Sequence, residues 1–115
     1  MKCLVVDDSK MSRMMLTKII TSTYPDWEIH EASDGQQAID IAKKVKVFDV
    51  VLLDYNMPVM DGGQAAEILR PMFPNAKMAF LTANIQESIK KLAIKLKIDF
   101  IPKPITEAKV LKYVG

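Results

Sequence analysis

The sequence FDVVLLDYNMP, at residues 48–58, decides the fold of this chain. Its apolar run from Val50 to Leu53 is unbroken, contains β-branched residues and shows no alternation of apolar and polar positions. This pattern predicts a strand covered on both faces, as in a parallel sheet packed between helices. The run ends in the carboxylate of Asp54, and the ligand crevices of such sheets lie at the carboxyl ends of the strands. We therefore expect Asp54 to lie where chemistry takes place.

Strand-like runs and helical patterns alternate on both sides of this stretch. Further strands are expected at residues 2–6, 27–32, 77–81 and 99–101, the last of them at a sheet edge. Helices are expected to follow Ser9, Gly35, Gly63, Ala83 and Pro104. Five strands that alternate with five helices over short connections favour a doubly wound α/β fold, an α/β/α sandwich of three layers with right-handed crossovers.

Apolar spacing also predicts which helical positions face the core. The predicted buried positions include Met11, Met14 and Met15 in the first helix and Ala65, Ile68 and Leu69 in the third. The three methionines fall on one helical face and are interpreted as core-filling side chains. The third helix is expected to stop at Arg70, because the residue before a proline, here Pro71, is disfavoured in α geometry.

The composition indicates one domain and says little about its partners. With 115 residues, half of them apolar, the chain suits a single domain over residues 1–115. Its net charge of +2 comes from 16 basic and 14 acidic residues spread along the chain, which argues against binding of nucleic acid or an anionic membrane. The N-terminus passes directly into a strand-like run without a leader or a long apolar segment, so a cytoplasmic location is expected. The single cysteine, Cys3, is interpreted as a buried structural thiol.

Polar and charged residues follow four of the predicted strands. Asp7 and Asp8 end the first strand, Asp54 the third and Thr82 the fourth, and Lys103 follows the fifth. Carboxylates that share a partly desolvated crevice repel one another unless a cation is bound, and a small site with oxygen ligands suits Mg²⁺. An ammonium and a hydroxyl beside such a metal suit a phosphoryl group.

Each of these features also has an ordinary structural interpretation. An Asp-Asp pair before a helix often serves as a cap, Lys103-Pro104 is often only a turn, and Thr82 could cap the next helix. Their joint placement at the same ends of neighbouring strands favours a functional site.

At these positions the sequence resembles the receiver domain of two-component response regulators, of the CheY-like type found in chemotaxis. The resemblance covers essentially the whole chain. The matching residues are Val5-Val6-Asp7-Asp8-Ser9, Asp34-Gly35, Asp54 to Pro58 with Met60-Asp61-Gly62, Leu81-Thr82-Ala83, and Phe100 with Lys103-Pro104. The resemblance implies a flavodoxin-like sheet with strand order 2-1-3-4-5.

The resemblance also implies a role for each residue of the acidic site. Asp54 would accept a phosphoryl group from a sensor histidine kinase or a phosphotransfer protein. Mg²⁺ would be held by Asp8, Asp54 and the backbone carbonyl of Asn56, with Asp7 acting chiefly through a metal-bound water. Lys103 would pair with the carboxylate of Asp54 and then with a phosphoryl oxygen, and the Lys103-Pro104 bond would be cis.

The remaining implied roles concern the response to phosphorylation. Thr82 would bond a phosphoryl oxygen, the small Ala83 would leave room for the group, and Phe100 would shift together with Thr82. This shift would change the face made by the fourth helix, the fifth strand and the fifth helix, and so control a downstream effector. Such a protein is not an enzyme in the usual sense, since it catalyses only its own phosphorylation and dephosphorylation.

One departure from the family pattern and two rival functions stay open. The glycine that is common before the fifth strand is replaced by Leu96-Lys97-Ile98, which leaves the end of the fourth helix undetermined. A metal-dependent phosphohydrolase with an aspartyl nucleophile would share the acids, but it typically has a second acid where Asn56 stands. A receiver-like module that binds partners without being phosphorylated is the other rival. Asn56 and Asn84 also occupy positions at which the family tunes hydrolysis.

Overall fold

The computed structural model describes residues 1–57, 60–83 and 86–115. Within them lie five strands and five helices: β1 (Lys2–Val6), α1 (Lys10–Thr23), β2 (Glu28–Ala32), α2 (Gly35–Val45), β3 (Val50–Asp54), α3 (Gly62–Met72), β4 (Lys77–Thr82), α4 (Glu87–Leu96), β5 (Asp99–Pro102) and α5 (Glu107–Val114). All the strands are parallel and form one sheet in the order β2-β1-β3-β4-β5. The predicted fold class and strand order are therefore confirmed.

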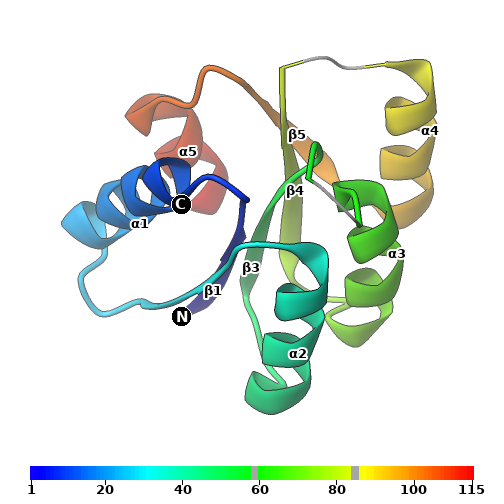
Figure 1. Cartoon of the computed structure of the whole chain (residues 1–115). Coiled ribbons are helices and arrows are strands. Elements are labelled where there is room, and N and C mark those ends of the chain that lie inside the picture. The colour runs from blue at the N-terminus through cyan, green and yellow to red at the C-terminus, as the bar shows by residue number, and fades with distance from the viewer. Residues whose placement is uncertain (58–59, 84–85) are drawn as a thin grey trace.

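Helices cover both faces of the sheet (Figure 1). α1 and α5 lie on one face, and α2, α3 and α4 lie on the other. Successive residues of a strand point to opposite faces, so each inner strand contributes to two cores. On the side of α2, α3 and α4 the buried strand residues include Leu4, Val6, Val51, Leu53 and Phe80. On the side of α1 and α5 they include Cys3, Val5, Val50, Leu52 and Leu81.

The stretch that predicted the fold forms the central strand. All five residues of β3 are buried, as expected for a strand with helices on both sides. Its register pairs Leu53 with Val6 of β1 and Asp54 with Leu81 of β4. The ends of β1, β3 and β4 therefore lie next to one another. Pro58, in the turn that follows, lies outside the described residues.

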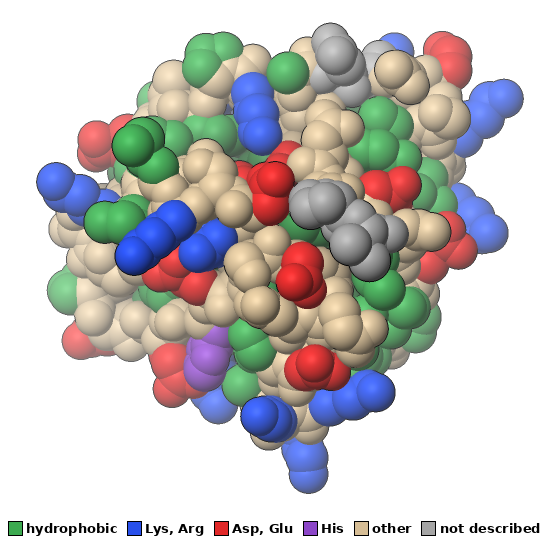
Figure 2. Space-filling view, in the orientation of Figure 1, with side chains coloured by type: hydrophobic (Ala, Val, Ile, Leu, Met, Phe, Trp, Pro, Cys, Tyr) green, Lys and Arg blue, Asp and Glu red, His purple; other side chains and the backbone are tan. Residues whose placement is uncertain are grey.

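The expected burial of the α1 methionines is wrong. Met11 is 81% exposed, Met14 58% and Met15 40%. The helix instead buries Leu16 and Ile20 against the sheet. At about 100° per residue these two lie on one stripe, whereas Met11 and Met14 lie on nearly the opposite side of the helix. Hydrophobic side chains are accordingly visible on the surface over α1 (Figure 2).

α3 differs from the prediction in its end and in its buried face. The helix continues through Pro71 to Met72, and Ile68 is 43% exposed. Pro71 lacks the N–H that would reach the carbonyl of Glu67, but Glu67 is exposed, so water can supply the missing donor. The chain beyond the helix is held by the guanidinium of Arg70, which donates to the carbonyl oxygens of Phe73 at 2.9 Å and Ala76 at 3.0 Å.

The end of α4, which the sequence left undetermined, is a left-handed cap without glycine. Lys97 adopts φ 57° and ψ 50°. Its backbone N–H donates to the carbonyl of Ile94 at 3.3 Å, and the N–H of Ile98 donates to that of Ala93 at 2.8 Å. This is the hydrogen-bonding pattern that a glycine usually provides. Ile85, which was also expected on the buried stripe of α4, lies outside the described residues.

The amino-terminal ends of the strands form the edge of the sheet opposite the acidic residues. Just before β2, the ring of Trp27 stacks on that of Tyr24 with centroids 4.7 Å apart and planes 16° from parallel. His30, on edge strand β2, contacts Glu28 at 2.6 Å.

No helix in the described parts of the chain is long and apolar enough to cross a membrane.

Candidate functional site

The sheet register brings three carboxylates together. Val6 pairs with Leu53, so the residues that follow them, Asp7 and Asp54, leave neighbouring strands at the same level. One carboxylate oxygen from each of Asp7, Asp8 and Asp54 lies within 4.8 Å of the others. Asp7 and Asp54 are each only 2% exposed, whereas Asp8 is exposed. The predicted acidic cluster thus joins Asp54 to two acids that precede it by 46 and 47 positions in the chain.

Asp7 is fixed by contacts to its backbone and its side chain. Its N–H donates to the carbonyl of Ala32 at 3.1 Å, and its Oδ1 accepts from the N–H of Ser9 at 2.9 Å. The guanidinium of Arg13 donates to the carbonyl oxygen of Asp7 at 2.7 Å and also to Glu31 at 3.2 Å. This role of Arg13 was not predicted from the sequence. The available signal was an arginine one turn after the Ser9 cap, a spacing that turns its side chain back toward the end of β1.

Lys103 supplies the positive charge predicted for this end of the sheet. Its backbone N–H donates to the carbonyl of Thr82 at 2.9 Å, which extends the β4–β5 pairing by one bond. Its Nζ then donates to Oδ1 of Asp54 at 3.1 Å, across 49 positions of sequence. The Lys103–Pro104 peptide bond is cis, as the resemblance implied.

Burial controls the electrostatics of the two inner acids. Loss of water raises the pKa of the Asp54 carboxyl, an effect opposed by the Lys103 ammonium and by a hydrogen bond from the backbone of Asn56. Burial also raises the pKa of Asp7, and the nearby Asp54 raises it further, while the bond from Ser9 lowers it. Three carboxylates, two of them poorly hydrated, therefore lie near the ammonium of Lys103.

The excess of negative charge and the kind of donor atoms show whether a metal ion suits the site. Oxygen donors from three carboxylates, two of them buried, match the preference of Mg²⁺ for hard oxygen ligands. A divalent cation would also offset the repulsion from Asp54, which adds to the effect of burial in raising the pKa of Asp7. The residues present therefore fit a magnesium ion.

The other predicted site residues lie on β4 and β5 or directly after β3 and β4. Thr82, which is 0% exposed, ends β4 and pairs in register with Pro102. Ala83 follows it and is exposed, and so is Asn56, two residues after Asp54. Phe100 is half-buried on β5, with its ring centroid 6.2 Å from that of Phe80. Asn84 lies outside the described residues.

Gly62 allows the loop after β3 to approach the site. A Cβ at this position would lie 2.6 Å from the carbonyl oxygen of Asp54 and 2.6 Å from Cα of Tyr55. The N–H of Gly62 also donates to the carbonyl of Tyr55 at 2.8 Å. α3 therefore begins directly against the backbone that carries Asp54, which a side chain at residue 62 would prevent.

Comparison with known proteins agrees with this geometry. A model of the response regulator receiver domain matches residues 3–115. The chain belongs to this family. It is 40% identical to Protein CcdB of Bacillus subtilis, over 99% of this chain and 94% of that protein. It is 36% identical to the chemotaxis protein CheY of Thermotoga maritima, over 96% and 92% of the two chains.

A solved structure of a related protein has the same fold as this chain. The CheX-CheY-BeF3-Mg complex of Borrelia burgdorferi contains a chain that superimposes with a TM-score of 0.87 at 34% identity, covering 98% of this chain and 85% of that one. The present chain is thus a CheY-like phosphoacceptor domain of a two-component system. Receiver domains bind Mg²⁺ at an acidic pocket and work with kinases and effector partners.

Proposed function

We propose that Asp54 is the phosphoacceptor of this receiver domain. The observation that carries the proposal is the ion pair between Lys103 and the almost completely buried Asp54, beside the carboxylates of Asp7 and Asp8. The position at the end of the buried central strand holds the nucleophile in place, and the exposed Asp8 lies on the side of the cluster that faces solvent.

The reaction exchanges one bond to phosphorus for another. A carboxylate oxygen of Asp54 forms a bond to phosphorus while the bond from phosphorus to the imidazole nitrogen of a donor histidine breaks, and the departing imidazole accepts a proton from solvent. Lys103 starts the reaction paired with Asp54 and then donates to a phosphoryl oxygen, since the carboxyl group of the acyl phosphate has lost its charge. The ammonium thereby compensates charge on the equatorial oxygens during transfer.

Asp7, Asp8 and Asp54, with the backbone carbonyl of Asn56, are the proposed ligands of Mg²⁺. When bound, the ion would neutralise charge on the phosphoryl oxygens. Asp7 is held by Ser9, Ala32 and Arg13, so it is ordered whether or not the ion is bound.

Thr82, Ala83 and Phe100 form the proposed switch. Thr82 ends the strand beside Asp54, Ala83 leaves space at its exposed end, and Phe100 lies on β5 next to the phenyl ring of Phe80. Capture of a phosphoryl oxygen by Thr82 would favour a second packing of Phe100 and alter the face made by α4, β5 and α5. Moving such an equilibrium from 1:99 to 99:1 takes about 5.5 kcal/mol of differential interaction.

We further propose that residues 1–115 act as one receiver unit whose chemistry is limited to its own phosphorylation and dephosphorylation. Its partners would be a sensor histidine kinase or phosphotransfer protein and a downstream effector. A cytoplasmic site of action stays a prediction.

Incubation with Mg²⁺ and acetyl phosphate, followed by intact mass measurement, tests the assignment of Asp54. We expect one phosphoryl adduct on the wild type and none on Asp54→Asn. Asp40→Asn, an exposed aspartate of α2, is the matched control and should be phosphorylated like the wild type. An adduct on Asp54→Asn, or no adduct on the wild type with metal present, would overturn the proposal.

Thr82→Ala tests the switch separately from the chemistry. We expect the variant to accept the phosphoryl group but to respond less, because it lacks the hydroxyl. The measurement is the change of the Phe100 ring NMR signals on addition of Mg²⁺ and beryllium fluoride, a phosphoryl mimic. Equal changes in wild type and variant would contradict this role.

A further inference from the structure

The loop that carries Lys103 has few backbone donors of its own. Both neighbours of Lys103 are prolines, Pro102 and Pro104, and neither has an N–H. The N–H of Lys103 reaches the carbonyl of Thr82, but beyond this bond the chain leaves the sheet. Apart from this bond, residues 102–104 can be held only through their carbonyl oxygens or their side chains.

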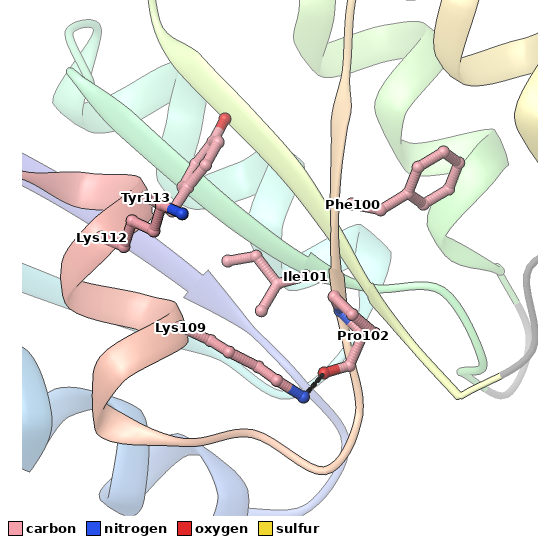
Figure 3. A pocket seen from close by; sticks show the side chains of 6 residues that line it. All are labelled: Phe100, Ile101, Pro102, Lys109, Lys112 and Tyr113. Carbon is pink, nitrogen blue, oxygen red and sulfur yellow. Dashed lines mark hydrogen bonds between the residues drawn. The ribbon is translucent and has the colours of Figure 1, made fainter.

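A second lysine binds these carbonyls. Nζ of Lys109, in the first turn of α5, donates to the carbonyl oxygen of Pro102 at 3.1 Å and to that of Pro104 at 3.0 Å. Figure 3 shows the side chain reaching from α5 across a pocket to Pro102 on β5. The ammonium thus binds the residues immediately before and after Lys103.

The position of Lys109 within α5 is an unusual one for a cation. Thr106 caps the helix, and its hydroxyl accepts from the N–H of Lys109 at 3.2 Å. At this third position of a helix a capping box has Glu or Gln, and the helix dipole favours acidic side chains. A lysine here opposes the local electrostatic preference of the helix, and its two bonds to the loop offset that disadvantage.

We infer that Lys109 is a positioning residue for Lys103. It acts by holding the carbonyls on either side of Lys103, so that the Lys103 ammonium stays at the carboxylate of Asp54. The inference rests on the proposed function, in which Lys103 compensates charge during phosphoryl transfer. Lys109 itself takes no part in the chemistry, because its donors are directed to backbone oxygens.

The test is a double-mutant cycle on the rate of phosphorylation by acetyl phosphate with Mg²⁺. Lys109→Met keeps the apolar stem and removes the ammonium, and we expect the rate to fall by about three- to tenfold, since a small displacement of a catalytic group has a large effect on rate. In a Lys103→Met background the same change should have no further effect, because Lys109 acts through Lys103. Lys109→Arg, which can still donate to two carbonyls, should restore most of the rate.

Two controls separate positioning from a general effect on folding. Lys112→Met removes a lysine of α5 from the same pocket (Figure 3) and should leave the rate unchanged. The Mg²⁺ affinity of Lys109→Met should not fall, because Asp7 is held by Ser9, Ala32 and Arg13, and a weaker contact of Lys103 with Asp54 does not hinder that carboxylate from binding the ion.

The outcomes distinguish this inference from the proposed function. If the wild type is phosphorylated on Asp54 and Lys109→Met reacts at the same rate, or if the two lysine substitutions are additive, the role of Lys109 is wrong while that of Asp54 stands. If the wild type takes up no phosphoryl group, the proposed function itself is wrong.

Discussion

At the scale of single residues, the site concentrates negative charge where there is little water. Asp7 and Asp54 are almost completely buried, Asp8 lies beside them, and Lys103 is their nearby positive partner. Charge of this kind lowers the stability of the folded protein unless a cation compensates it. The acids are thus present for function and not for stability, and substitutions should show this.

Asp7→Asn should make the metal-free protein more stable at neutral pH. Burial raises the pKa of Asp7 above its ordinary value of 3.8, so the folded chain binds this proton more tightly than the unfolded chain. The stability contributed by the neutral carboxyl is complete below the ordinary value and is lost as pH rises through the raised pKa. Thermal unfolding without Mg²⁺ should show a higher Tm for the variant at pH 7 and a shrinking difference toward acid pH. A variant of lower Tm at pH 7 would contradict this account.

Gly62→Ala should disturb the site through the backbone. The new Cβ would overlap the backbone of Asp54 and Tyr55, which cannot rotate away, and overpacking of this kind costs about 1–3 kcal/mol. Gly35→Ala is a matched control, since Gly35 also begins a helix but its Cβ would meet the flexible side chain of Met60. Urea unfolding should show a clearly larger loss for Gly62→Ala, and its phosphorylation should also be slower. Equal losses in the two variants would refute the backbone explanation.

At the scale of the elements, most helix ends have a few local contacts that fix them. α1, α2, α3 and α5 begin at side-chain caps, which are Ser9, Asp34, Asp61 and Thr106. The C-terminal ends of α2 and α4 are less usual, because Lys46 and Lys97 occupy the left-handed region where glycine is favoured. The β-carbon of a lysine is strained in this conformation.

Lys97→Gly should therefore stabilise the protein. Relief of the left-handed strain is worth about 1–2 kcal/mol, and the greater freedom of glycine in the unfolded chain offsets part of it, so a net gain of roughly 0.5–1 kcal/mol is expected. Lys95→Gly, within α4, is the control and should instead cost up to about 1 kcal/mol. Chemical denaturation measures both changes, and a loss of stability in Lys97→Gly would rule out strain at this cap.

At the scale of the whole molecule, ion binding at one end of the sheet should stabilise the entire fold. A ligand that binds only the folded state adds about 2.7 kcal/mol when its concentration is 100 times its Kd. Mg²⁺ should therefore raise the Tm of the wild type relative to EDTA, and the rise should be smaller for Asp8→Asn. Calorimetry with and without the ion measures both, and an equal rise in wild type and variant would show that the ion binds elsewhere.

The sequence was sufficient for the features that depend on pattern alone. The apolar run of β3 predicted a buried central strand, and the acids at two strand ends predicted a cluster that the parallel register brings together. The resemblance to the family then supplied the strand order and the cis bond.

The remaining features depend on tertiary contacts. Methionine is compatible with core and with surface, so spacing did not reveal that the buried stripe of α1 consists of Leu16 and Ile20. The roles of Arg13 and Lys109 depend on backbone carbonyls of other elements, and these carbonyls carry no sequence signal. A proline usually ends a helix, but α3 continues through Pro71, and the carbonyl that Pro71 leaves without a donor belongs to the exposed Glu67.

The stacking of Trp27 on Tyr24 has a practical consequence for spectroscopy. Trp27 is the sole tryptophan, and it lies at the amino-terminal end of β2, whereas the acids lie at the carboxyl ends of the strands. Its fluorescence should report the loss of the fold but should not respond to metal or phosphoryl binding. An optical reporter of the signalling state would need a second fluorophore nearer the site. Phe100→Trp would supply one, since the ring of Phe100 is half-buried on β5.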